Sequence, residues 1–114
     1  MSKKYHVQKR ELLNLHTDMR AYVIGIVEDT RDIKICCENS ETRSEIILKI
    51  ADCSDEIDLW FDLRTPIERE NSLHKISKLA EAIISVRDAI EGEVVSMNEK
   101  QSLQQQARAA SAVQ

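Results

Sequence analysis

Glycine, proline and aromatic residues are scarce in this chain. Its 114 residues include two glycines and one proline, and aromatic residues make up 4% of the total. Average protein usage is about 7% glycine and about 5% proline. So few turn-forming residues argue against a β-sandwich with many turns, and they exclude collagen-like chains and Pro/Gly-rich disordered chains. The glycine-rich loops that bind phosphate groups are absent as well.

Metal-binding patterns are also missing. The three cysteines are Cys36, Cys37 and Cys53. They include no Cys-x-x-Cys pair, and the three histidines are scattered along the sequence. A structural zinc site needs such pairs together with further ligands. An odd number of cysteines without a secretory signal is typical of reduced intracellular thiols, so we expect neither a metal nor a cofactor.

The motifs of common enzyme classes are absent from the sequence. It contains no His-Glu-x-x-His, no Gly-x-Ser-x-Gly and no Gly-x-x-x-x-Gly-Lys. Carboxylates are concentrated between residues 52 and 62, but acid–base catalysis needs them in a cleft with shifted pKa values. We therefore expect a protein without catalytic activity. A small enzyme that uses these carboxylates or a thiol is the third hypothesis for its function.

Long apolar runs are missing too. No segment approaches the roughly 18–20 apolar residues of a membrane span, and residues 1–6 lack the apolar segment of a secretory signal. The composition, with 42% hydrophobic and 32% charged residues, is typical of a soluble globular protein. We expect one cytoplasmic domain over residues 1–97 that makes no membrane contact.

The residue pattern predicts a helix followed by four strands. Residues 5–20 contain good helix formers, and their apolar positions Tyr5, Leu12, Leu15 and Met19 follow helical spacing. The predicted strands are rich in β-branched residues and cover residues 21–27, 33–38, 45–51 and 56–64. Gly25 in the first of them predicts a bulge or a close backbone approach. The short links favour antiparallel pairing, because parallel strands need crossovers of a dozen or more residues.

A long helix is predicted after the last strand. Thr65-Pro66-Ile67-Glu68 is a capping box with proline at the first helical position. We expect the helix to be weak or to end at Gly92. Residues 98–114 are rich in Gln and Ala, and we expect them to form a flexible tail. The expected fold class is α+β. It consists of an N-terminal helix, a four-stranded antiparallel β-meander, a long C-terminal helix packed on the sheet, and a disordered tail.

The predicted strand 56–64 carries a tryptophan between two carboxylates. Asp58, Trp60 and Asp62 alternate with apolar residues and therefore share its polar face. Tryptophan is a frequent hot-spot residue, and flanking charges speed the encounter with a partner. We expect these residues, with Asp55 and Glu56, to form a partner-binding patch. Alternatively, Trp60 is buried under a helix and the carboxylates protect a sheet edge from aggregation.

The predicted long helix has apolar residues with a 3, 4, 3, 4 spacing. They are Ile76, Leu79, Ile83, Val86 and Ile90. Isoleucine and valine at such positions support helix pairing, so we expect a homodimer held by these residues. The alternative is a core stripe that packs on the sheet of the same chain.

Charge is unevenly distributed along the chain. The net charge is −4, with +3 over residues 1–20, −7 over residues 21–72 and zero over residues 73–114. The residues of the basic N-terminal segment considered for contact with phosphates are Lys3, Lys4, Lys9 and Arg10. Spaced basic residues on a helix can follow a nucleic-acid backbone. Alternatively, they form a solvated helix face.

These observations predict a non-catalytic module that binds another protein as an inhibitor, adaptor or chaperone, and that forms a homodimer. A nucleic-acid-binding regulator that uses the basic N-terminal helix is the second hypothesis. The expected helix–meander–helix layout and the acidic balance resemble those of small secretion chaperones and of phage-encoded inhibitors of host defence. That resemblance concerns architecture and composition, and it implies no site residues.

Overall fold

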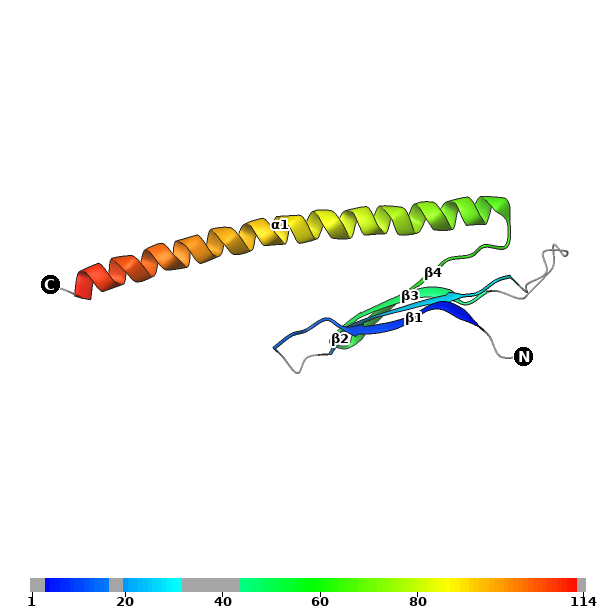
Figure 1. Cartoon of the computed structure of the whole chain (residues 1–114), viewed down its shortest axis with the longest axis horizontal. Helices are drawn as coiled ribbons and strands as arrows, with labels where there is room; N and C mark the ends of the chain where they lie inside the picture. Colours follow the sequence, from blue (N-terminus) through cyan, green and yellow to red (C-terminus); the bar gives the residue numbers. More distant parts are fainter. Residues whose placement is uncertain (1–3, 17–19, 32–43, 113–114) are drawn as a thin grey trace. The chain divides into compact units, whose positions relative to one another are not determined.

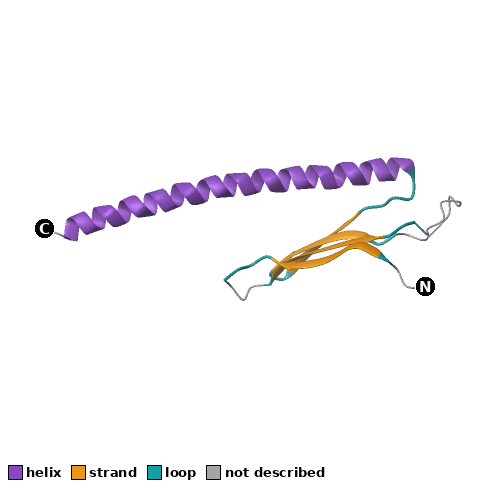
Figure 2. Cartoon of the chain, viewed as in Figure 1, coloured by secondary structure: helices purple, strands orange, loops and turns teal. Residues whose placement is uncertain are grey.

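The described residues form one β-sheet and one long helix. The computed structural model describes residues 4–16, 20–31 and 44–112. Its elements are β1 (Tyr5–Leu12), β2 (Ala21–Glu28), β3 (Ile46–Asp52), β4 (Asp55–Trp60) and α1 (Pro66–Ala112). The four strands form one antiparallel sheet in sequence order (Figures 1 and 2). The α+β class and the antiparallel sheet are therefore confirmed, but one of the four strands, β1, lies in the segment predicted as a helix. The chain divides into two compact units, Met1–His74 and Lys75–Gln114.

The predicted N-terminal helix is wrong. Residues 5–12 form strand β1, which pairs with β2 from Tyr5↔Glu28 to Leu12↔Tyr22 and shifts register between Tyr5 and Val7. Helix propensity is a weak prior that tertiary context overrides. Here the outer side of β2 offers a row of backbone donors and acceptors, and β1 satisfies them. Without that helix, the helix–meander–helix layout is absent, and the resemblance to secretion chaperones and phage inhibitors loses its architectural basis.

The other predicted strands have different outcomes. The strands predicted at 21–27 and 45–51 are confirmed as β2 and β3, whereas the strand predicted at 56–64 is shorter and ends at Trp60. The strand predicted at 33–38 lies outside the described residues. The pairing of Gly25 with Lys9 and Leu48 is regular, so the predicted bulge is absent there. A Cβ at Gly25 would meet Val7 Cγ1 at 3.9 Å, an ordinary contact.

The register divides the sheet into two faces of different character. One face, here called the apolar face, combines Val23, Val27, Leu48, Ile50, Ile57 and Leu59 on β2–β4, and β1 adds Lys9 and Glu11 to it. The other, here called the mixed face, combines Arg10, Tyr22, Ile24, Ile47, Lys49, Glu56, Asp58 and Trp60. Successive side chains of a strand alternate between faces, so each cross-strand row belongs to one face. The buried hydrophobic residues of the described chain are Ala21, Ile47, Ala51 and Phe61.

Hydrogen bonds fix the start of α1. Thr65 Oγ1 accepts from the backbone N–H of Glu68 at 3.1 Å, as the N-cap residue of the predicted helix should. The Ser72 hydroxyl donates to the backbone oxygen of Asp62 at 2.6 Å, and Ser72 is buried. Arg69 Nη1 donates to the backbone oxygen of Leu63 at 2.9 Å. The predicted helix start is therefore confirmed and tied to the chain that leaves β4.

The helix is much longer than predicted. It runs through Gly92 without a break and continues to Ala112, so the prediction of a disordered tail is wrong for residues 98–112. At about 1.5 Å per residue, its 47 residues extend about 70 Å. Alanine and glutamine are good helix formers, which explains how the tail stays helical without an apolar stripe. Packing of α1 on the sheet stays a prediction. In the part of the chain that the structure describes, no helix is long and apolar enough to cross a membrane.

Candidate interaction site

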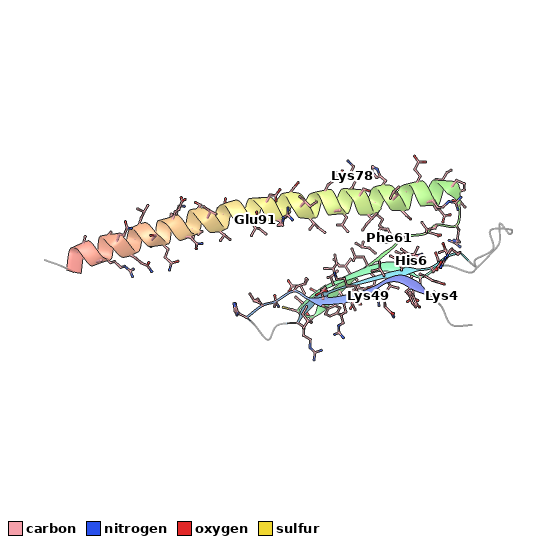
Figure 3. All side chains as sticks on the ribbon, in the orientation of Figure 1. Lys4, His6, Lys49, Phe61, Lys78 and Glu91 are labelled. Carbon is pink, nitrogen blue, oxygen red and sulfur yellow. The ribbon has the colours of Figure 1, made fainter. Side chains whose placement is uncertain are left out.

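Strand β4, the last strand of the described sheet, carries part of the predicted partner-binding patch. Its side chains on the mixed face are Glu56, Asp58 and Trp60, which we call the β4 patch. Their cross-strand neighbours on β3 are Ala51, Lys49 and Ile47, and Figure 3 shows Lys49 on this sheet. Trp60 is 44% exposed, whereas its neighbour Ile47 is only 3% exposed. Trp60 is therefore partly accessible beside a buried aliphatic residue on the next strand.

A tyrosine joins the β4 patch to the strands beside it. The Tyr22 hydroxyl on β2 donates a hydrogen bond to the Glu56 carboxylate on β4, across the intervening strand β3. The Arg10 guanidinium carbon lies 5.6 Å from the centre of the Tyr22 ring, within the range of cation–π attraction. The hydrogen bond raises the pKa of Tyr22 and lowers that of Glu56, and the charge of Lys49 lowers the Glu56 pKa further. Glu56 is therefore held as a carboxylate.

A second tyrosine–glutamate pair lies at the other end of the sheet. The Tyr5 hydroxyl donates to Glu45 at 2.9 Å, and the pKa of Tyr5 is raised mainly by that hydrogen bond. The backbone N–H of Glu45 donates to the carboxylate of Glu28, a residue only 8% exposed, at 2.7 Å. Tyr22 thus reaches the strand next but one in the sheet, and Tyr5 reaches the residue that precedes β3. Such bonds hold the register in which the β4 patch forms.

Asp62 does not belong to the β4 patch, although the sequence placed it beside Trp60. It follows the end of β4, and Arg64 donates to its carboxylate from Nη2 at 2.6 Å and from Nε at 2.9 Å. These bonds hold the pKa of Asp62 well below its usual range. The backbone oxygen of Asp62 also accepts from Ser72 of α1. Asp62 therefore connects β4 to the helix.

Asp55 is the remaining acid of the predicted patch, and it lies in the β3–β4 turn. It pairs with Asp52 across a two-residue loop, Cys53 and Ser54. Successive side chains alternate between faces, so Asp55 shares the face of Ile57 rather than that of Glu56. Of the five predicted patch residues, the sheet brings together three.

Asp29 forms a charged cluster that the sequence analysis missed. Arg31 donates to its carboxylate from Nη2 at 2.7 Å, and His6 Nε2 lies 3.7 Å from Oδ1. The Asp29 side chain is 8% exposed, and hydrogen bonds from Arg31 lower its pKa to about 2. The sequence signal is an Asp-x-Arg triplet directly after a strand. The same triplet recurs at Asp62 and Arg64.

The basic N-terminal segment does not form one surface. Lys9 and Arg10 are neighbours on β1 and therefore belong to opposite faces of the sheet. Lys9 Nζ lies 3.7 Å from Glu11 Oε1, and the Arg10 guanidinium lies over the Tyr22 ring. Lys4 is exposed just before β1, and Lys3 lies outside the described residues. The helix face proposed for contact with phosphates is therefore absent.

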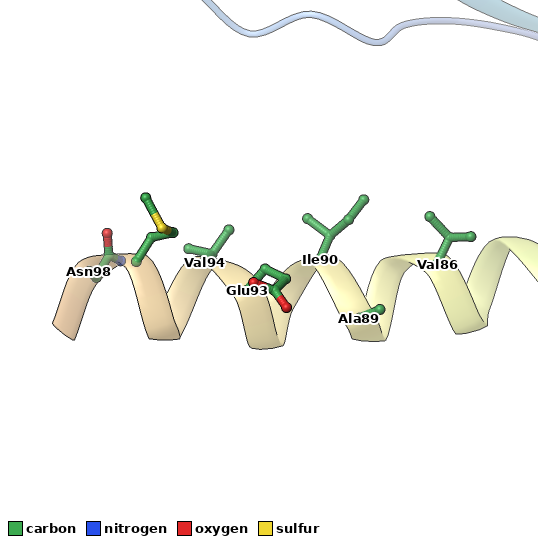
Figure 4. Close-up of a pocket in the computed structure, with 7 residues that line it drawn as sticks. Val86, Ala89, Ile90, Glu93, Val94 and Asn98 are labelled. Carbon is green, nitrogen blue, oxygen red and sulfur yellow. The ribbon is translucent and has the colours of Figure 1, made fainter. Parts of the chain in front are cut away.

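The predicted dimer residues lie on α1 and are accessible. Ile76 is 37% exposed, and Ile83, Val86 and Ile90 are 52–57% exposed. Val94 and Met97, the less regular apolar positions that follow in the sequence, are exposed as well. Figure 4 shows Val86, Ile90 and Val94 on one side of the helix, where they line a shallow groove with Ala89, Glu93 and Asn98. Leu79 is half-buried.

Neither grouped metal-ligating side chains nor similarity to known proteins points to another site in the described residues. Within residues 4–16, 20–31 and 44–112, no three His, Cys, Asp or Glu side chains are grouped as a metal site would need. Comparisons of the chain with protein families, curated proteins and solved structures found no match.

Proposed function

We propose that the protein is a non-catalytic module that binds another protein through the β4 patch. The observation that carries the proposal is the accessible Trp60, 44% exposed, which follows two carboxylates on the same face of a terminal strand of the described sheet. Tryptophan buries a large area when a partner covers it and loses little conformational entropy. The two carboxylates favour a partner with basic residues beside an apolar side chain.

The backbone of β4 supports an extended partner segment. The N–H of Phe61 donates to the oxygen of Ile46 at 3.1 Å, so Phe61 is bonded toward β3. Antiparallel pairing alternates, and the backbone groups of Glu56 and Asp58 therefore point away from β3. A strand added along this edge would bond to those groups, while its side chains on the mixed face met Trp60 and the carboxylates. We infer that the partner segment is extended and carries an apolar residue with basic residues to one side of it.

Capture experiments test this proposal. The tagged full chain is used as bait in lysate of its native host, with and without nuclease, and captured proteins are identified by mass spectrometry. We expect a nuclease-resistant protein that the wild type retains and that the double variant Trp60→Ala/Asp58→Ala loses. Ile57→Ala is the matched control, because Ile57 is exposed on the opposite face of the same strand.

Two outcomes contradict the proposal. Retention of the same protein by the double variant would show that the β4 patch is not the contact surface. A cargo that nuclease and salt remove would support the nucleic-acid hypothesis instead, because phosphate contacts weaken steeply with salt. Circular dichroism of both variants confirms that a lost interaction does not reflect lost folding.

A further inference from the structure

The apolar stripe of α1 has a heptad register. Counting Ile76 as position a, the a positions are Ile76, Ile83, Ile90 and Met97, and the d positions include Leu79 and Val86. The a-position residues are 37–60% exposed. The groove on this helix lies along the same stripe (Figure 4). An accessible apolar seam of this kind is suited to packing against another helix.

One acid interrupts the seam. The d position after Val86 is Glu93, an exposed residue that lines the groove. In a parallel, in-register pair, each d residue meets the same residue of the partner. Glu93 would therefore lie against the partner's Glu93 in the seam. Like charges placed opposite each other disfavour that arrangement.

An antiparallel pair gives Glu93 an opposite charge. With a two-fold axis between residues 84 and 85, Ile83 meets the partner's Val86, and Leu79 meets the partner's Ile90. The position symmetric to Glu93 is the partner's Ile76, so Glu93 lies opposite Ile76 and beside the neighbouring Lys75 of the partner. The stripe is thus complementary to itself in charge, and the same surface serves both copies, as a two-fold interface requires.

Small residues border the seam near the axis. Three of the four positions that flank it there are Ala80, Ala82 and Ala89, and the fourth is Arg87. The distance between packed helices depends on the side chains at the contact and is about 8 Å at its smallest. Alanine at three of these positions permits close approach, and the charge of Arg87, whose side chain is 62% exposed, is paired with Asp88 and Glu91 of its own helix.

We propose that α1 pairs antiparallel with α1 of a second copy, crossing between residues 84 and 85. The interface consists of the Ile83, Val86, Leu79 and Ile90 layers, with Lys75 beside the partner's Glu93 on both sides of the axis. This proposal goes beyond the binding of a partner protein and uses none of the β4 patch residues.

Sedimentation equilibrium of the full chain at several concentrations tests the pairing. We expect a reversible dimer for the wild type. Glu93→Lys and Lys75→Glu should each weaken dimerisation about tenfold, because each change turns two attractive pairs into repulsive ones. The double variant Lys75→Glu/Glu93→Lys should return to within about twofold of the wild type, since the pairs are restored with reversed charges. Glu99→Lys makes the same charge change away from the seam and should have little effect.

Three results would overturn the proposal. A monomer at every concentration would mean that the stripe is covered within its own chain. A dimer that neither single charge reversal weakens would be parallel. A dimer that also survives Ile83→Asp would use a different surface. Trp60→Ala should leave the dimer intact, so this experiment and the capture experiment fail independently.

Discussion

At the scale of single residues, two Asp-x-Arg triplets organise the ends of strands. Asp29 and Arg31 follow β2, and Asp62 and Arg64 follow β4. In both, the arginine donates its backbone N–H to Oδ1 at 3.0 Å and its guanidinium to the same carboxylate. The first contact is an Asx turn and the second a charge-assisted pair. The two triplets form the same turn, so the turn is determined locally by these three residues.

The Asp29 pair should make stability depend on acid pH. Its folded pKa is about 2, below the value of about 3.9 in an unfolded chain. Stability from this depressed pKa is complete above about pH 4 and is lost as the pH falls through 2. In Asp29→Asn, the urea midpoint should therefore depend less on pH between pH 4 and pH 2 than in the wild type. Glu99→Gln, which alters an exposed helix carboxylate, should keep the wild-type slope.

Cys53 adopts a backbone conformation that suits glycine. Its φ is 58°, at the first position of the two-residue β3–β4 loop, where hairpin turns favour glycine. A left-handed conformation costs a non-glycine residue about 1–2 kcal/mol, and the flexibility of unfolded glycine offsets about 0.5–1 kcal/mol of that. Cys53→Gly should therefore raise the free energy of unfolding by roughly 1 kcal/mol. Cys53→Ser removes the thiol alone, and an equal gain from it would contradict this explanation.

At the scale of elements, β1 shows how pairing overrides local propensity. Residues 5–12 favour a helix by composition, but in the fold they supply the partner strand of β2. The N–H of Leu13 donates to the oxygen of Ala21, so the N–H of Lys9, four residues earlier, also faces β2. The N–H of Gln8 faces away from β2.

Proline substitutions distinguish this strand from a helix. Lys9→Pro removes a ladder hydrogen bond and should lower the urea midpoint clearly, whereas Gln8→Pro sits at an outward position that edge strands tolerate. In a helix, both prolines would be interior and both would be disruptive. Equal losses in the two variants would contradict the strand assignment of residues 5–12.

The glycine in α1 is a weak position that packing does not require. No atom lies within 4 Å of a Cβ built at Gly92. Gly92→Ala should stabilise the helix by about 1 kcal/mol, the propensity difference between the two residues. Thermal melting followed by circular dichroism measures the change. Ser85→Gly, another position off the apolar stripe, should shift the melting temperature downward, and a shift in the same direction as Gly92→Ala would contradict the propensity argument.

At the scale of the whole molecule, the accessibility of the only tryptophan is the simplest observable. Trp60 is 44% exposed. We expect acrylamide to quench its fluorescence substantially, at a level between free tryptophan and a buried indole. Quenching should decrease when the partner protein binds. Quenching as weak as that of a buried indole in the unbound protein would support the alternative that Trp60 is covered.

The sequence by itself determined the elements whose signals are local. The alternation of β4 placed Asp58 and Trp60 on one face, and Thr65 with Pro66 marked the start of α1. These features depend on neighbours in the chain, through the two-residue period of strands and the unpaired N–H groups of a helix start. The apolar stripe of α1 was visible for the same reason.

Tertiary structure decided what depends on distant residues. Residues 5–12 are a strand because β2 lies beside them, and Tyr22 belongs to the site because Glu56 is within hydrogen-bonding reach. The alternation of the sequence places Asp62 and Trp60 on the same face of a strand. In the structure, Arg64 and Ser72 donate hydrogen bonds to Asp62, whereas Trp60 stays accessible. Strand pairing joins residues that are far apart in the sequence, so no local pattern of charge or hydropathy specifies it.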